Sequence, residues 1–209
     1  MIFEAMAVGI YGANCYIVGS EETKEAAIID PGAEFNRIEK KLNDLGLKAK
    51  IIILTHCHGD HIGAVEEFVE KYGTKVYIHK DDASSLSDGK MNFSKSMFGK
   101  DMPIKADVIL NDGDEINLGE LKFEIIHTPG HTKGGISIKV GNIMMTGDTL
   151  FNNSIGRTDF PGGSFKEIIS SIKNKILKYD DDTIIYPGHM SSSTIKKEKM
   201  FNPFLQDND

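Results

Sequence analysis

The chain has 209 residues, of which 40% are apolar, so it can bury a sizeable core, and nothing in it suggests more than one domain over residues 1–209. A formal net charge of −7 gives no broad basic surface, which argues against nucleic acid as a partner and favours a small, soluble substrate. Two cysteines, Cys15 and Cys57, are too few for a disulfide framework and fit the reduced thiols of a cytoplasmic protein.

Short β-rich runs alternate with amphipathic stretches along the whole chain. The N-terminal segment has Glu4 in place of a basic flank and alternates like a strand, so neither a signal peptide nor a membrane span is predicted. Apolar residues three and four apart predict surface helices over Glu34 to Leu45 and Phe165 to Leu177. Short connections predict antiparallel hairpins, and hence mixed sheets with helices packed outside them. Strands are predicted at residues 26–29, 51–54, 75–78, 121–126, 136–140, 143–145 and 183–186.

The stretch from Ser84 to Lys105 is the least regular part of the chain. It is rich in Ser, Lys, Gly and Met. Such a composition suggests a flexible insertion, and we interpret it as a possible lid over a site.

The densest cluster of chemically active side chains is THCHGDH, residues 55–61, which follows a buried strand. His56 and His58 are two apart and share one side of an extended segment, whereas Asp60 and His61 follow the turn at Gly59 and open a predicted helix, Ile62 to Tyr72. Imidazole and carboxylate groups together suit zinc, iron or manganese. Cys57 should point to the opposite side, and we interpret it as a packing residue.

Three further segments place a ligand-type side chain in a glycine-containing turn after an apolar strand. They are IIHTPGHT with His131, IMMTGDT with Asp148, and IIYPGHM with His189. Strands that end along one edge would bring all seven candidate ligands to a common cleft. His79 and His127 also end strands but lack such a turn, so we expect a structural or ligand-orienting role for them.

The order of these seven residues resembles the metallo-β-lactamase superfamily. NCYIV and IIDPG near the start and NPFL near the end are similar to its compact, bacterial glyoxalase II-like branch. The resemblance implies an α/β fold, a four-layer αββα sandwich of two mixed sheets. It also implies one metal held by His56, His58 and His131 and a second held by Asp60, His61 and His189, with Asp148 between them.

Two divalent metal ions are therefore the expected cofactors, with zinc first and iron or manganese as alternatives. Such ions, about 3.5 to 4 Å apart, share a water and lower its pKa from near 15.7 toward roughly 7, which supplies a metal-bridged hydroxide as nucleophile. Asp60 is a catalytic candidate, because it could orient the hydroxide as well as bind metal.

The resemblance implies hydrolysis of a 2-hydroxyacyl thioester such as S-lactoylglutathione. However, the Lys and Tyr with which glyoxalase II holds glutathione are replaced here by Arg157 and Asp159. Arg157 is a candidate for binding a substrate carboxylate, and a salt bridge to Asp159 is an equally good interpretation of it. The sequence leaves the acyl group, the thiol carrier and the oligomeric state open.

Persulfide dioxygenases of the same superfamily provide the alternative. They also carry a cysteine within the first motif, as Cys57 here, and a GRTDF stretch. That resemblance implies a single iron held by His56, His131 and Asp148. The surroundings of His189 are nearer the hydrolase pattern, although Met190 and Ser191 replace its usual Gly and Pro.

Overall fold

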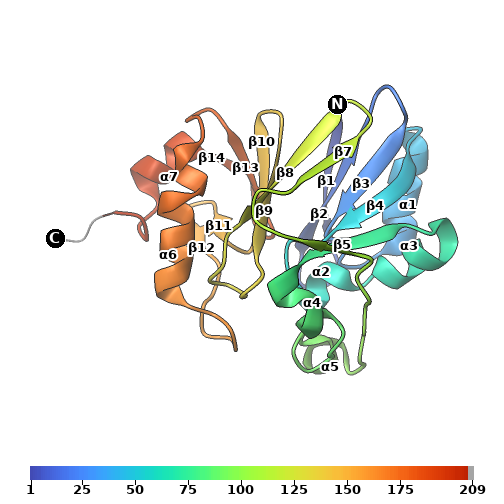
Figure 1. Ribbon diagram of the computed structural model, residues 1–209, viewed down its shortest axis with the longest axis horizontal. Helices are drawn as coiled ribbons and strands as arrows, with labels where there is room; N and C mark the ends of the chain where they lie inside the picture. The colour runs from blue at the N-terminus through green and yellow to red at the C-terminus, as the bar shows by residue number, and fades with distance from the viewer. Residues whose placement is uncertain (207–209) are drawn as a thin grey trace.

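The computed structural model describes residues 1–206 as two six-stranded sheets that pack face to face (Figure 1). The first sheet contains, in spatial order, β1 (Ile2–Val8), β2 (Ala13–Gly19), β3 (Glu25–Ile29), β4 (Lys48–Ile53), β5 (Lys75–His79) and β6 (Val108–Leu110). The second contains β14 (Ser193–Thr194), β13 (Ile184–Pro187), β10 (Ile143–Gly147), β9 (Ile136–Val140), β8 (Leu121–His127) and β7 (Glu115–Leu118). A small ribbon pairs β11 (Leu150–Phe151) with β12 (Ser154–Ile155).

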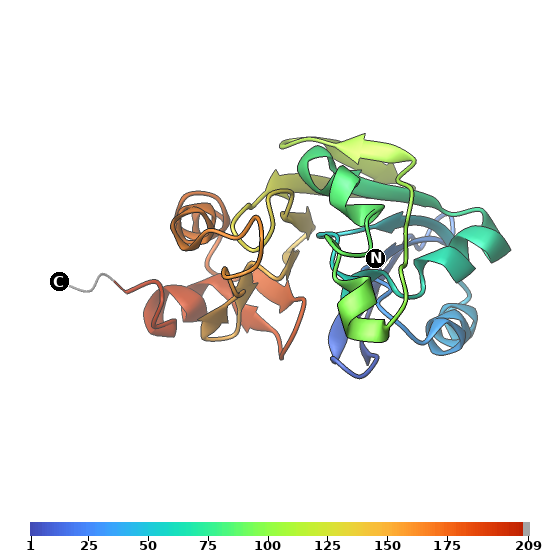
Figure 2. The same ribbon diagram turned by 90° about the horizontal axis from the view of Figure 1, so that it is seen from below.

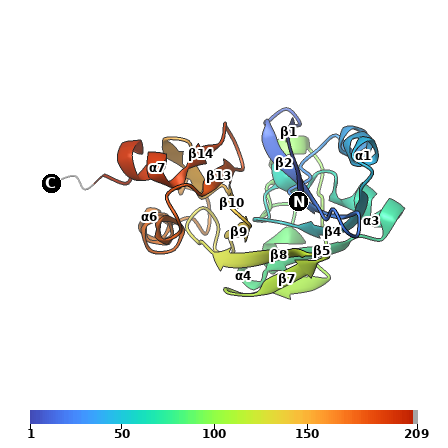
Figure 3. The ribbon, with the colours of Figure 1, turned by 90° about the horizontal axis from the view of Figure 1, so that it is seen from above.

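Helices cover the outer face of each sheet, as the view from above shows (Figure 3). Apolar residues of α1 and α3 pack on the first sheet, and those of α6, η1 and α7 pack on the second. The predicted four-layer αββα sandwich is confirmed. The helical segments are α1 (Phe35–Asp44), α2 (Gly59–Ile62), α3 (Val65–Tyr72), α4 (Lys80–Leu86), α5 (Ser94–Phe98), α6 (Phe165–Asn174), the 3₁₀ turn η1 (Ile176–Lys178) and α7 (Ile195–Phe201).

The core between the sheets is built from alternate residues along each strand, whose side chains point inward. Ile29 and Ile53 of the first sheet belong to the same buried cluster as Phe123 and Ile138 of the second. Both sheets are mixed, as predicted. In the first, β1 to β3 form antiparallel pairs and β3 to β6 run parallel. In the second, β7 to β10 form antiparallel pairs. Since β10 also pairs parallel with β13, several strands end at the same edge.

The strands that were not predicted include β6, β7 and the two-residue strands β11, β12 and β14. β6 has only three residues, too few for a periodic signal. β7 does alternate, with Ile116 and Leu118 buried and Glu115 and Asn117 exposed, so its pattern was readable but short.

The helix predicted over Ile62 to Tyr72 is wrong in its boundaries, because the chain forms two helices, α2 and α3. Ala64 donates its backbone N–H to the carbonyl of Pro31 at 2.9 Å. A Cβ at Gly63 would lie 2.2 Å from the carbonyl oxygen of Gly32, so this close crossing of two backbones requires glycine. The break separates α2, which carries Asp60 and His61, from the covering helix α3.

The stretch from Ser84 to Lys105 contains α5 and is held by buried polar residues. The Asn92 side chain donates to the carbonyls of Leu86 and Met102 at 3.0 and 3.1 Å. Ser94 accepts from the backbone N–H of Met102 at 2.9 Å. Figure 2 views the molecule from the side on which this segment lies. Within residues 1–206, no helix combines the length and apolar character needed to cross a membrane.

Candidate metal centre

The seven predicted ligands come together at one edge of the two sheets, on loops and on the short helix α2. His56 and His58 follow β4, and Asp60 and His61 lie in α2. The other three, His131, Asp148 and His189, follow β8, β10 and β13. The loop after β13 can pass close to Asp148 because residue 188 is glycine: a Cβ there would lie 2.1 Å from Asp148 Oδ1.

Three imidazoles form the first group. The ring centroids of His56, His58 and His131 lie 4.7 to 4.8 Å apart. His131 Nε2 faces His58 Nδ1 at 2.9 Å. All three side chains are buried, and one nitrogen from each lies within 4.8 Å of the others, which is the arrangement expected of three ligands to one metal ion.

Asp60, His61 and His189 form the second group. Asp60 Oδ2 lies 3.2 Å from His189 Nε2 and 3.8 Å from His61 Nε2. These atoms also lie within 4.8 Å of one another. Asp60 and His189 are partly exposed, so this group opens to solvent more than the first one does.

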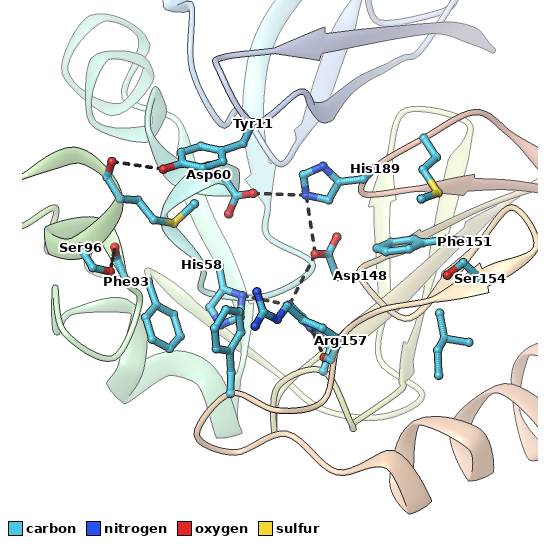
Figure 4. A pocket seen from close by; sticks show the side chains of 15 residues that line it. Tyr11, His58, Asp60, Phe93, Ser96, Asp148, Phe151, Ser154, Arg157 and His189 are labelled. Atoms are coloured by element: carbon cyan, nitrogen blue, oxygen red, sulfur yellow. Dashed lines mark hydrogen bonds and ion pairs between the residues drawn. The ribbon is translucent and has the colours of Figure 1, made fainter. Parts of the chain in front are cut away.

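Asp148 lies between the two groups and contacts both (Figure 4). Its Oδ2 is 3.5 Å from His131 Nε2 and 3.7 Å from His189 Nε2, and its Oδ1 is 3.5 Å from His61 Nε2. One carboxylate that reaches both groups is suited to bridging two cations.

The centre fits metal ions because three of its buried ligand atoms lack a hydrogen-bond partner. Within residues 1–206, four buried side-chain atoms have no hydrogen-bond partner, and three of them are His56 Nε2, His61 Nε2 and Asp148 Oδ1. Burying such atoms unpaired costs about 1 to 3 kcal/mol each. Metal ions bound at the two groups would coordinate these three atoms and remove that cost.

Neighbouring groups fix which ring nitrogen faces the centre in His56, His61 and His131. The Nδ1 atom of His61 lies 2.9 Å from Asp30 Oδ2, and that of His131 lies 2.8 Å from the carbonyl oxygen of Arg157. Thr55 Oγ1 lies 3.1 Å from His56 Nδ1. Each contact holds Nδ1 and so turns Nε2 of the same ring toward the centre.

Asp30 and Asp82 are two carboxylates that we did not predict as site residues. Asp30 also accepts from the backbone N–H of Thr55 at 2.7 Å. Asp82 accepts from the hydroxyl of Thr132 at 2.8 Å and from the backbone N–H of Cys57 at 3.2 Å, which ties the two loops of the first group together. Asp30 lies in IIDPG, and Asp82 carries no recognisable signal in the sequence.

The histidines of the two groups differ in the direction in which their pKa values are shifted. Burial, together with neighbouring imidazoles, lowers the pKa of His56 well below its usual value and that of His58 to about 3, so both are neutral ligands at neutral pH. Burial also lowers the pKa of His61, but Asp60, Asp148 and Asp30 outweigh that effect and raise it to about 10. The second group therefore attracts positive charge, as a proton or as a metal ion.

A cleft of about 530 Å³ lies in front of both groups. Arg157 lines it, but its guanidinium donates to both carboxylate oxygens of Asp159 at 2.7 and 2.6 Å and stacks 3.9 Å above the ring centre of Phe160. Of the two interpretations of Arg157, the salt bridge to Asp159 is present, and a contact to substrate stays a prediction.

The remaining sequence candidates lie outside the centre. His79 and His127 stack on each other with ring centroids 4.0 Å apart. Cys57 is buried in the apolar cluster beneath α3, as expected of a packing residue, and Cys15 lies in the same cluster.

The family model of the metallo-β-lactamase superfamily matches residues 8–189. The chain belongs to this superfamily. Among curated superfamily relatives, it is 38% identical to the hydroxyacylglutathione hydrolase GloC of Haemophilus influenzae, over 98% of each chain.

Three solved structures of the superfamily are also similar. The B3 metallo-β-lactamase BLEG-1 has a TM-score of 0.92 and 35% identity, over 98% of this chain and 99% of that one. TTHA1623, solved in a di-iron-bound form, has a TM-score of 0.85 and 32% identity, over 97% and 100%. ETHE1 from Myxococcus xanthus has a TM-score of 0.84 and 30% identity, over 97% and 84%.

Proposed function

We propose that this superfamily member is a dinuclear metal-dependent hydrolase of a 2-hydroxyacyl thioester, with S-lactoylglutathione as the first substrate to test. The observation that carries the proposal is Asp148, whose carboxylate contacts a ligand group on each side. The similarity to GloC, named as a hydroxyacylglutathione hydrolase, supports the choice of substrate.

Each ligand group would hold one divalent ion. His56, His58 and His131 would bind the first, Asp60, His61 and His189 the second, and Asp148 both. When bound, such ions polarise a carbonyl group and lower the pKa of coordinated water toward neutrality. We place zinc first, because a set of imidazoles and carboxylates suits it, and the di-iron form of TTHA1623 supports iron as the alternative.

Asp60 is the residue we assign to proton handling. Burial raises its pKa, but His61 and His189 outweigh that effect and hold the pKa below the usual value, so the carboxylate stays ionised at neutral pH. It lines the cleft and is partly exposed, so its oxygen can accept a hydrogen bond from an attacking water and orient it toward the substrate carbonyl.

The test combines elemental analysis of the protein as isolated with an assay of the metal-loaded protein. We expect two metal ions per chain and release of free thiol from S-lactoylglutathione. Removing metal with a chelator should abolish the release, and adding zinc or ferrous iron should restore it. Two metals per chain with no hydrolysis of S-lactoylglutathione or any simpler acyl thioester would overturn the proposal.

A persulfide dioxygenase is the second candidate, supported by the similarity to ETHE1 and by Cys57 within the first motif. It would use one iron at His56, His131 and Asp148. Against it, His61 Nε2 in the second group is also a buried ligand atom without a hydrogen-bond partner. A single iron per chain, with oxygen uptake on glutathione persulfide, would favour this candidate over the hydrolase.

A further inference from the structure

Two phenylalanine rings form a wall beside the first ligand group. Phe93 lies 5.1 Å and Phe160 5.6 Å from the ring centroid of His58, and the two phenyl rings lie 4.6 Å from each other. Phe160 also lies 6.5 Å from His131. Both rings line the cleft and are only partly covered, so they present apolar surface to whatever binds at the ligands.

The backbone of Phe93 is held in an unfavourable conformation to place its ring there. Its φ angle is 60°, in the left-handed region that bulky residues rarely adopt. Its neighbours Asn92 and Ser94 are fully buried, and the Ser94 N–H donates to Asn92 Oδ1 at 2.9 Å. The buried neighbours hold this strained backbone in place and so keep the ring in the cleft. Strained residues of this kind are found at ligand-binding positions.

The opposite side of the centre is apolar as well. The ring of Phe151 lies 6.1 Å from that of His189 (Figure 4), and Ile155 and Met190 also line the cleft. A thioester carbonyl held at the ligands has its acyl substituent only two bonds away. Whether the acyl end of the thioester lies toward the first ligand group or toward His189, that substituent would meet a phenyl ring.

A charged substituent would find little in the cleft to pair with. Among the described lining residues, Arg157 is the only one with a permanent positive charge, and Asp159 already binds it with two hydrogen bonds. Apolar contact is therefore the main interaction that the walls offer.

We propose that the preferred substrate carries an apolar substituent on its acyl group, an aromatic ring best of all, in place of the methyl group of a lactoyl thioester. This inference rests on the proposed thioester hydrolysis and names the acyl class for the same site. The Phe93 and Phe160 wall selects the ring, and the chemistry at the ligands is the same for either substituent.

The experiment compares S-lactoylglutathione with S-mandeloylglutathione, which differ in one methyl or phenyl group. We expect kcat/KM of the metal-loaded protein to be at least about tenfold higher for the mandeloyl thioester, a typical gain from filling an apolar pocket. Equal values within threefold, or a preference for lactoyl, would overturn the inference. Binding of mandelate and lactate, measured by calorimetry, gives the same comparison without turnover.

Three variants test whether the wall is responsible. Phe160→Ala should reduce the mandeloyl preference to threefold or less, and Phe93→Leu, which keeps apolar volume, should reduce it less. Phe201→Ala is the matched control, because Phe201 is 62% exposed on α7 and is not among the cleft residues. If a folded Phe160→Ala protein kept the full preference for the mandeloyl thioester, the wall would not be its cause, and the proposal would be refuted.

The two failures are distinguishable. If neither thioester is cleaved, the proposed function fails, and the calorimetric comparison of mandelate with lactate still decides whether the wall prefers a ring. If both are cleaved without the expected preference, the function stands and the inference fails.

Discussion

Two groups of histidines lie at strand ends in this protein, and they use their ring nitrogens differently. In the metal centre, His56 Nε2 and His61 Nε2 are buried without a hydrogen-bond partner. In the pair formed by His79 and His127, His79 Nδ1 accepts the backbone N–H of Asp81 at 3.3 Å, and His127 Nε2 donates to the Lys133 carbonyl at 2.8 Å. The metal centre needs a cation, whereas the protein itself supplies a hydrogen-bond partner to each ring of the His79–His127 pair.

The difference shows that position after a strand does not identify a ligand. One nitrogen or oxygen atom each from His79, Asp81 and His127 also lies within 4.8 Å of the others. However, the two rings are nearly parallel, with 15° between their planes, so they face each other and do not converge on a shared point. Convergence of unpartnered atoms, together with carboxylates that attract charge, distinguishes the centre.

The largest expected effect comes from removing the carboxylate shared by the two ligand groups. Asp148→Asn should lower the metal content below two ions per chain and reduce kcat/KM for the thioester about a thousandfold, or about 4 kcal/mol of transition-state stabilisation. Elemental analysis and the hydrolysis assay measure the two effects. Asp81→Asn, in the satisfied pair, is the matched control and should change neither. Unchanged metal content in Asp148→Asn would contradict the distinction drawn between the metal centre and the His79–His127 pair.

A smaller effect should follow from loosening one orienting contact. Asp30→Asn weakens the acceptor for His61 Nδ1 without removing a ligand. We expect the affinity of the second metal to fall about 10- to 100-fold, while the first remains bound, because orienting partners of histidine ligands typically contribute that much. A chelator titration that follows both metals would measure it. Equal weakening of both metals would indicate a general loss of structure.

The smallest effect concerns the satisfied pair. Burial, with His127 beside it, lowers the pKa of His79 from 6.5 to about 4. Between those values the unfolded chain binds more protons than the folded one, so the free energy of unfolding should fall as pH drops from about 6.5 to 4. We expect the loss to be on the order of 1 kcal/mol after allowance for nearby solvent.

Replacing the titrating ring tests this. His79→Gln keeps an acceptor for the Asp81 N–H but does not titrate, so its free energy of unfolding should vary less with pH than that of the wild type. Denaturant unfolding at pH 7 and pH 5 gives the comparison. Identical pH dependence in the two proteins would show that His79 is not coupled to folding.

Local patterns in the sequence were sufficient to find the seven candidate ligands and the mixed sheets with helices outside them, whereas the four-layer sandwich followed from the resemblance to the superfamily. Residues 55–61 and the three glycine turns identify seven side chains that the structure then brings together. The alternation of strands with amphipathic helices predicted mixed sheets covered by helices. Such patterns are readable because a strand or a helix imposes a fixed short period on its buried face.

The tertiary structure decided which other side chains serve the centre. Asp82 accepts a hydrogen bond from Thr132, 50 residues away in the sequence. The ring of Phe93, between β5 and β6, contacts that of Phe160, between β12 and α6. The break at Gly63 depends on the backbone at Gly32 crossing there. These contacts join segments far apart in the chain, so no local period encodes them. The sequence by itself determined what could bind a metal ion, and packing determined which nitrogen faces it and what surrounds the substrate.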